Sequence, residues 1–210
     1  MTLVLSYFFG FIAAIVGVLP PGLINLTAAK INLNHSKKQA FQFVMGAVIT
    51  IFLQTYISVL FARLLDQNQQ IVILFREIGF VIFTILTFYF FKFAKKPTLQ
   101  QTTDSKNVSN FLLSGLGVAA INVFPIPYYV FVSISMASYS IFSFQTAQIL
   151  SLVLGVVTGS ALIFYCYVVF FNRLKQKTKA LQNMNKIIGS ITGIVALATL
   201  FNLLKYYFHL

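Results

Sequence analysis

The chain is poor in charge, and it has only three acidic residues and one cysteine. Of its 210 residues, 9% are charged and 59% are hydrophobic. A soluble domain of this length could not hide that much apolar surface, because its exterior would need far more charged side chains. The composition therefore excludes an ordinary soluble protein and predicts an integral membrane protein.

The lack of thiols and histidines limits the chemistry that the chain can perform. Cys166 is the only cysteine, which excludes an internal disulfide and a metal site built from several thiolates. His35 and His209 are predicted at opposite membrane faces, and the apolar runs hold no paired acids and no Ser/His/Asp set. We therefore expect no metal, no cofactor and no enzymatic activity.

Six long apolar runs account for most of the chain, and they do not alternate between apolar and polar residues. Because lipid offers no partners to the backbone, such runs predict α-helices rather than strands. Each run is long enough to cross a hydrocarbon core of ~30 Å. The first run lacks a basic leading segment and a cleavage site, so we expect a retained span. The predicted spans are 3–29, 40–62, 71–93, 111–135, 146–171 and 187–208.

The basic residues are unevenly distributed between the two sides that these spans define. Twelve of the fifteen fall in the three odd-numbered loops. The positive-inside rule then places these loops in the cytoplasm and both termini outside it. The net charge of +12 is explained by topology and by attraction to anionic lipid, so we expect membrane lipid and no nucleic acid as a partner.

The two halves of the chain share a pattern of glycine, proline, glutamine and basic residues at offsets that drift from 105 to 110. Because each half has three spans, the second half would enter the membrane from the opposite side, as in the inverted-topology repeats of transporters. We predict one membrane domain with a first repeat at 1–94, a cytoplasmic linker at 95–110 and a second repeat at 111–210. The matched pairs are Gly10 with Gly115, Pro20 with Pro125, Gly22 with Pro127, Gln39 with Gln148, Gly46 with Gly155, Arg76 with Lys186 and Gly79 with Gly189.

Proline motifs interrupt the first and fourth runs, in "GVLPPGLINL" (17–26) and "NVFPIPYY" (122–129). A proline removes a hydrogen-bond donor and clashes with the carbonyl four residues before it, so both helices are predicted to break. Each break has a carboxamide within one turn, from Asn25 and Asn122. The carbonyls expected to lose their partners are those of Val16, Gly17, Ile121 and Val123.

Two such breaks, reached from opposite faces, would enclose one cavity for a small zwitterion. Helix-start N–H groups favour a carboxylate, while freed carbonyls accept from an ammonium group. The alternative is that each proline only kinks its helix. The expected substrate-binding residues are Pro20, Pro21, Gly22, Asn25, Asn122, Pro125, Pro127 and Gln54.

Two polar residues inside the second and third spans leave alternatives open. Gln54 follows Thr50 by one helical turn, so both share a face that forms interhelical hydrogen bonds or lines a cavity. Glu77 is either a proton-coupling group or the ion-pair partner of Arg76 or Arg63. Freed carbonyls at the breaks could instead hold Na⁺, so the coupling ion is H⁺ or Na⁺.

The stretch "GVLPPGLINLTAAKINLNHSKKQAFQFVMGAVIT" resembles the lysine exporter (LysE) family of bacterial amino-acid exporters. Members have about this length, six hydrophobic segments, a Pro-Gly-Pro motif followed by Asn, and a second proline motif preceded by Asn. Here the first motif is Pro20-Pro21-Gly22, and the second is opened to "NVFPIP", which is typical of a divergent member. The resemblance carries over to Pro20, Gly22, Asn25, Asn122 and Pro125.

The resemblance implies an exporter of amino acids or related small metabolites in the plasma membrane (the bacterial inner membrane), driven by an ion gradient. We expect a secondary active transporter in which two inverted repeats give alternating access to the site between Asn25 and Asn122. A cationic side chain would lack a counter-charge near the predicted cavity, so we expect a neutral amino acid or analogue as substrate. A homodimer is left open. The alternative is a non-transporting membrane subunit or assembly factor.

Overall fold

The computed structural model describes residues 2–20, 22–93, 110–176 and 178–208, and within these ranges it is all-helical, with no strand. Pro21 and the predicted linker up to residue 109 lie outside the described residues. The elements are α1 (Thr2–Val18), α2 (Leu23–Asn34), α3 (Lys37–Asp66), α4 (Gln69–Phe88), the π-helix η1 (Tyr89–Phe93), α5 (Phe111–Ile121), α6 (Pro125–Ser138), α7 (Thr146–Gln176) and α8 (Thr178–Phe208).

Several of these helices are long and apolar enough to cross a membrane. Three do so as single helices, at Lys37–Asp66, Val72–Phe93 and Thr146–Phe170. The pairs α1 with α2 and α5 with α6 are each bent at a short break, so the count rises to five if each pair is one span. The apolar part of α8, Thr192–Phe208, is shorter. The chain is thus a multi-pass membrane protein, and its sixth span stays a prediction.

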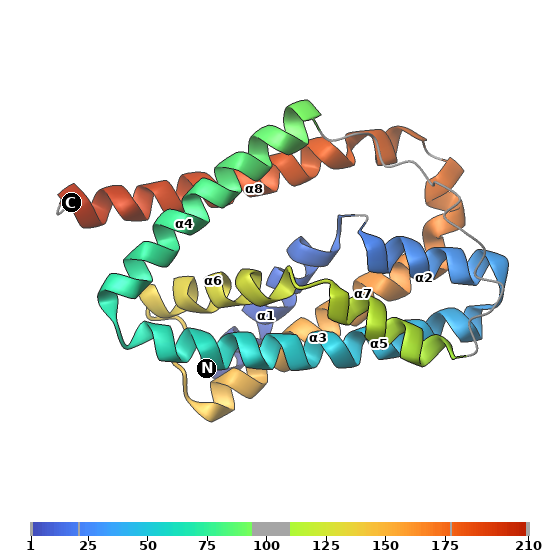
Figure 1. The fold of residues 1–210 in the computed structure, drawn as a ribbon, viewed down its shortest axis with the longest axis horizontal. Helices are drawn as coiled ribbons and strands as arrows, with labels where there is room; N and C mark the ends of the chain where they lie inside the picture. The colour runs from blue at the N-terminus through green and yellow to red at the C-terminus, as the bar shows by residue number, and fades with distance from the viewer. Residues whose placement is uncertain (1, 21, 94–109, 177, 209–210) are drawn as a thin grey trace.

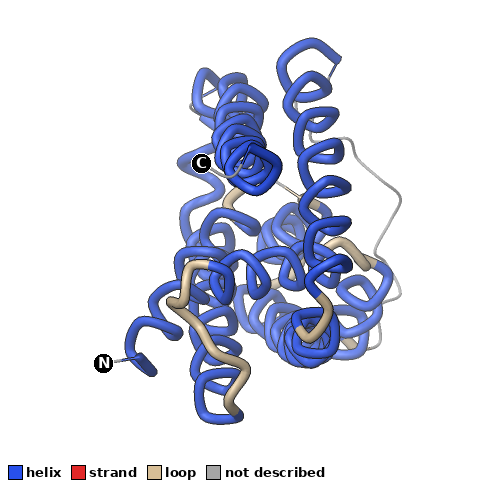
Figure 2. The backbone as a smooth tube through the Cα atoms, turned by 90° about the vertical axis from the view of Figure 1, so that its left-hand side faces the viewer, coloured by secondary structure: helices blue, strands red, loops and turns tan. Residues whose placement is uncertain are grey.

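The helices are arranged as a bundle with one separate pair beside it. Helices α4 and α8 pack side by side along one edge, and the other helices lie together below them in the view of Figure 1. Figure 2 shows the same division from the side. The hydroxyl of Thr87 on α4 donates to that of Thr192 on α8 (3.0 Å), which joins the two helices within the apolar pair.

Two helices in the bundle start with side-chain caps. The Ser36 hydroxyl accepts from the Gln39 N–H at the start of α3. The Asn110 side chain accepts from the N–H groups of Leu112 and Leu113 at the start of α5. Each cap pairs donors that the first helical turn leaves without an acceptor.

Glycines set the close contact between α1 and α7. A Cβ at Gly10 would overlap the carbonyl of Leu152, and a Cβ at Gly155 would overlap the carbonyl of Tyr7. Lipid is as apolar as the helix surfaces, so helices in membranes associate largely by close packing of this kind. Only glycine lets these two backbones approach so closely.

The contact between α3 and α5 is built in the same way. A Cβ at Gly46 would overlap the Leu112 carbonyl, and a Cβ at Gly115 would overlap the Phe43 carbonyl. One turn further along α3, the Thr50 hydroxyl lies 3.2 Å from the Leu116 carbonyl, to which it donates. Both tight contacts bring α1 and α5 against the long helices and so fix where the two proline breaks lie.

Candidate substrate site

The first proline motif separates α1 from α2, whose axes are bent by 73°. Helix α1 ends at Val18 and α2 begins at Leu23, with Gly22 in an extended conformation as the N-cap. The helix ends here because Pro20 and Pro21 cannot donate to the carbonyls of the preceding turn. The predicted break of the first helix is therefore present.

Side chains pair three carbonyls at this break. The Asn25 side-chain amide donates to the carbonyls of Val18 (2.6 Å) and Pro20 (2.8 Å). The Tyr167 hydroxyl, from α7, donates to the carbonyl of Leu19 (2.7 Å). Asn25 is only 3% exposed, as expected of a group that satisfies buried acceptors. Asn25 thus lies next to the first break and also stabilises it by pairing two of its carbonyls.

The second motif separates α5 from α6, which are bent by 63°. The Val123 N–H donates to the Ile121 carbonyl (3.0 Å), and the Ile126 N–H donates to the Val123 carbonyl (3.1 Å). Pro125 and Pro127 still remove the usual helical donors of these two carbonyls, but other N–H groups replace them, so the expectation that both carbonyls are free for a ligand is wrong. A tight turn after Ile121 brings nearer N–H groups to both acceptors, which the proline positions alone do not reveal.

The side chain of Gln54, on α3, forms hydrogen bonds with the backbone at the second break. Its side-chain amide donates to the carbonyls of Ala119 (3.2 Å) and Asn122 (3.1 Å). Gln54 is 8% exposed, and its side-chain oxygen has no hydrogen-bond partner among the described residues. Gln54 therefore contacts the backbone of one predicted site residue, although it does not line the cavity described next.

Both breaks open onto a cavity of about 80 Å³. The first break contributes Pro20, Gly22 and Asn25, and the second contributes Asn122 and Pro125. Five of the predicted site residues are thus brought together, while Pro127 and Gln54 are outside the lining and Pro21 is outside the described residues. The other residues that line the cavity are Gly17, Val18, Leu23, Ile24, Ile51, Phe124, Tyr128, Tyr129 and Phe164.

The polar groups around this cavity differ between the two breaks. At α2 the Leu26 N–H donates to the Gly22 carbonyl, so the N–H groups of Leu23 and Ile24 precede the helical pattern and have no acceptor within the helix. At α6 the prolines carry no N–H, and the N–H groups of Ile126 and Tyr128 are used within the turn. The start of α2 therefore presents the donors, as a helix N-terminus that favours an anion.

The same cavity is also lined by residues that carry hydrogen-bond acceptors. The Gly17 carbonyl lacks its helical donor because residue 21 is proline. The Asn122 side chain is partly buried and has no hydrogen bond in the part of the chain that the structure describes. None of the fourteen lining residues is an acid, a lysine, an arginine or a histidine. The arrangement suits a small neutral or zwitterionic solute.

Several lining residues were not predicted as site residues. Tyr128 places its ring against Gly17 and donates from its hydroxyl to the Ala13 carbonyl (2.8 Å). Ile51 and Phe164 line the cavity from α3 and α7. Tyr128 could have been predicted, because its hydroxyl stands next to the second proline motif in an apolar run. Nothing in the sequence distinguishes Ile51 or Phe164 from their apolar neighbours.

A second cavity, of about 310 Å³, shares a wall with the first. Gly17, Pro20, Phe124 and Tyr128 border both cavities. The remaining walls come from α1 and from the separate helix pair, through Val16, Phe83, Leu86, Phe90, Thr192 and Val195.

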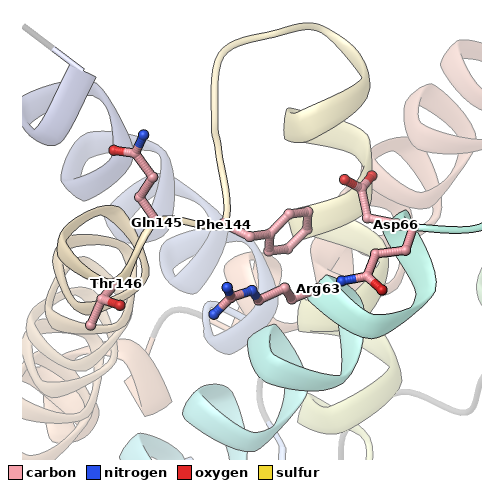
Figure 3. A pocket seen from close by; sticks show the side chains of 6 residues that line it. Arg63, Asp66, Phe144, Gln145 and Thr146 are labelled. Carbon is pink, nitrogen blue, oxygen red and sulfur yellow. The ribbon is translucent and has the colours of Figure 1, made fainter.

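A third cavity, of about 560 Å³, lies at one end of the bundle and contains charge. It is lined by Arg63, Asp66 and Gln67 at the end of α3 and by Phe144, Gln145 and Thr146 before and at the start of α7 (Figure 3). Arg63 follows Gln54 by nine residues, which is about 14 Å along a helix. This cavity is therefore distinct from the one at the breaks.

Glu77 lies on α4 and accepts a hydrogen bond from the Tyr207 hydroxyl on α8. Among the described residues it forms no ion pair with Arg76 or Arg63, so that alternative is wrong. Glu77 is absent from the lining of all three cavities. Its described contact joins the two helices of the separate pair.

Comparison with known proteins gives a match to a protein family. A family model described as LysE type translocator matches residues 15–205, which include both proline breaks. No curated protein and no solved structure matches the chain.

Proposed function

The chain belongs to the LysE type translocator family, and we propose that it is a secondary active exporter of neutral amino acids or related small metabolites. The family is one of translocators rather than enzymes, so a small-molecule substrate and a lipid environment follow from membership. The observation that carries the proposal is the uncharged cavity of about 80 Å³ that is lined by residues of both proline breaks, Asn25 and Asn122 included.

In this proposal the cavity binds the α-carboxylate and α-ammonium groups of the substrate. The N–H groups of Leu23 and Ile24, at the start of α2, face the carboxylate. The Gly17 carbonyl and the Asn122 side-chain oxygen accept from the ammonium group. A zwitterion brings its own opposite charges, which explains why a site without ionised side chains suffices.

The inverted repeat also belongs to the proposal, and the packing supports it. Gly10 contacts Leu152, and Gly115 contacts Phe43, so glycines 105 residues apart contact carbonyls 109 residues apart. These are the offsets of the sequence repeat. The reciprocal contacts, Gly155 with Tyr7 and Gly46 with Leu112, obey the same two offsets. Each half therefore packs its broken helix against the other half by equivalent contacts, as expected of three spans repeated in inverted topology.

Alternating access would use this architecture. The cavity lies between a broken helix of each half, so movement of one half against the other would expose it to either side in turn. In the same proposal both termini lie outside the cytoplasm and export is coupled to H⁺ or Na⁺. Glu77 is the candidate proton carrier because it is the only acid within the predicted spans.

The proposal is tested by exchange in proteoliposomes that contain only this protein. Vesicles loaded with one unlabelled amino acid would be diluted into the same labelled amino acid, and counterflow would be measured for neutral, cationic and anionic members. We expect counterflow of neutral amino acids well above that of protein-free vesicles, with little for lysine or glutamate. Equal background signals for every amino acid would contradict the proposal and favour a non-transporting subunit.

A further inference from the structure

The cavity of about 310 Å³ beside the polar one is apolar and is bordered by both parts of the molecule. Helices α1 and α6 and the first break form one side. The separate pair forms the other, with Leu86 on α4, Phe90 on η1 and Val195 on α8. Pockets for small ligands typically start at ~300 Å³, so this cavity has the volume of a ligand site and the polar cavity alone does not.

The lining of this second cavity excludes a charged occupant. It contains no acid, lysine, arginine or histidine. Its two hydroxyl residues are already engaged, since Tyr128 donates to the Ala13 carbonyl and Thr192 donates to the Gly189 carbonyl. A charged or strongly polar side chain placed here would lose its hydration without gaining a partner, which is costly.

The two cavities adjoin where the proposed ammonium site lies. Gly17 and Tyr128 border both, and a Cβ at Gly17 would lie 3.0 Å from the Tyr128 ring. A ligand whose carboxylate lies at the start of α2 and whose ammonium group lies at Gly17 would therefore have its side chain next to the apolar cavity. Because residue 17 is glycine, no side chain at this position stands between the two cavities.

We propose that the apolar cavity is the side-chain pocket of the transporter, and that its substrates are amino acids with bulky apolar side chains, of leucine to phenylalanine size. This inference rests on the proposed function, because it names the substrate class of the same site. The occupant of the cavity is thus the substrate side chain rather than a lipid chain. Small substrates such as alanine would leave most of the cavity unfilled and gain little from it.

The test fills the pocket from α8 and compares substrates of two sizes. Val195→Phe places a ring in the apolar cavity, and Ile194→Phe places the same ring on the adjacent, 66% exposed position of the same helix. Counterflow of labelled leucine and of labelled alanine would be measured in proteoliposomes for both variants and for the unaltered protein. We expect the leucine-to-alanine rate ratio to exceed one in the unaltered protein and to fall about tenfold or more in Val195→Phe.

Ile194→Phe should leave that ratio unchanged. An equal ratio in Val195→Phe and the unaltered protein would overturn the inference and favour lipid as the occupant. If Val195→Phe does not insert, Val195→Ala decides: a higher phenylalanine-to-alanine ratio supports the pocket, and an unchanged ratio overturns it. If the unaltered protein exchanges alanine but shows no preference for leucine, the side-chain pocket is contradicted and the proposed function stands. If it exchanges no neutral amino acid, the proposed function itself is contradicted.

Discussion

Asn25 and Val18 are joined across the first proline break by a hydrogen bond of 2.6 Å, from the Asn25 side-chain amide to the Val18 carbonyl. The bond connects the first turn of α2 to the last residue of α1. A proline break in a membrane leaves main-chain acceptors that lipid cannot satisfy. Asn25 provides a donor for two of these acceptors, the carbonyls of Val18 and Pro20. The Gly17 carbonyl is left without a helical donor.

The first prediction concerns the role of Asn25 in stability. Asn25→Ala removes the donor to the carbonyls of Val18 and Pro20, and a buried acceptor without a partner costs about 1–3 kcal/mol. We expect a lower thermal unfolding midpoint in detergent, followed by circular dichroism. Asn34→Ala, at the exposed last residue of α2, is the matched control and should change stability by less than about 0.5 kcal/mol. Equal midpoints for the two variants would show that Asn25 does not hold the break.

The second prediction concerns the glycine contacts. Gly115→Ala places a methyl group on the Phe43 carbonyl and should destabilise the protein by about 1–3 kcal/mol, because two backbones must separate. Gly117→Ala, on the same helix, meets no other atom within 4 Å and should stabilise α5 by about 0.5–1 kcal/mol. Thermal unfolding in detergent measures both effects. A similar shift in the two variants would contradict the packing between α3 and α5.

The third prediction separates a coupling role of Glu77 from a structural one. Glu77→Gln keeps an acceptor for the Tyr207 hydroxyl but cannot bind and release a proton. If Glu77 carries the proton, counterflow should persist while accumulation driven by a pH gradient is lost. Tyr207→Phe removes the hydrogen bond and keeps the carboxylate, so it should retain coupling. Unchanged gradient-driven accumulation in Glu77→Gln would assign Glu77 a purely structural role.

The sequence was sufficient to predict the helical class, both breaks and the two asparagines that border the cavity. Prolines and carboxamides inside an apolar run are costly in lipid, so their positions carry information that apolar residues do not. Asn25 and Asn122, far apart in sequence, do line one cavity. Their role in binding remains a prediction.

The remaining features depend on tertiary contacts that leave no local pattern. The Val123 N–H reaches the Ile121 carbonyl through a tight turn, which the spacing of the prolines does not specify. Tyr167 reaches the first break from α7, and its distance along the chain gives no hint of that contact. The apolar cavity is likewise made by packing α4 and α8 beside the bundle, and its lining looks like ordinary lipid-facing sequence.

The proposed function requires the cavity between the two breaks to bind the charged groups of a neutral amino acid. Asn122 tests it most directly, because its side chain lines the cavity and makes no described hydrogen bond, so its loss should not disturb the fold. Counterflow of leucine should fall at least about tenfold in Asn122→Leu, which loses a hydrogen bond to a charged group worth about 1.5–3 kcal/mol, and should persist in Asn34→Leu. Normal leucine counterflow in Asn122→Leu, at equal protein content, would contradict the account.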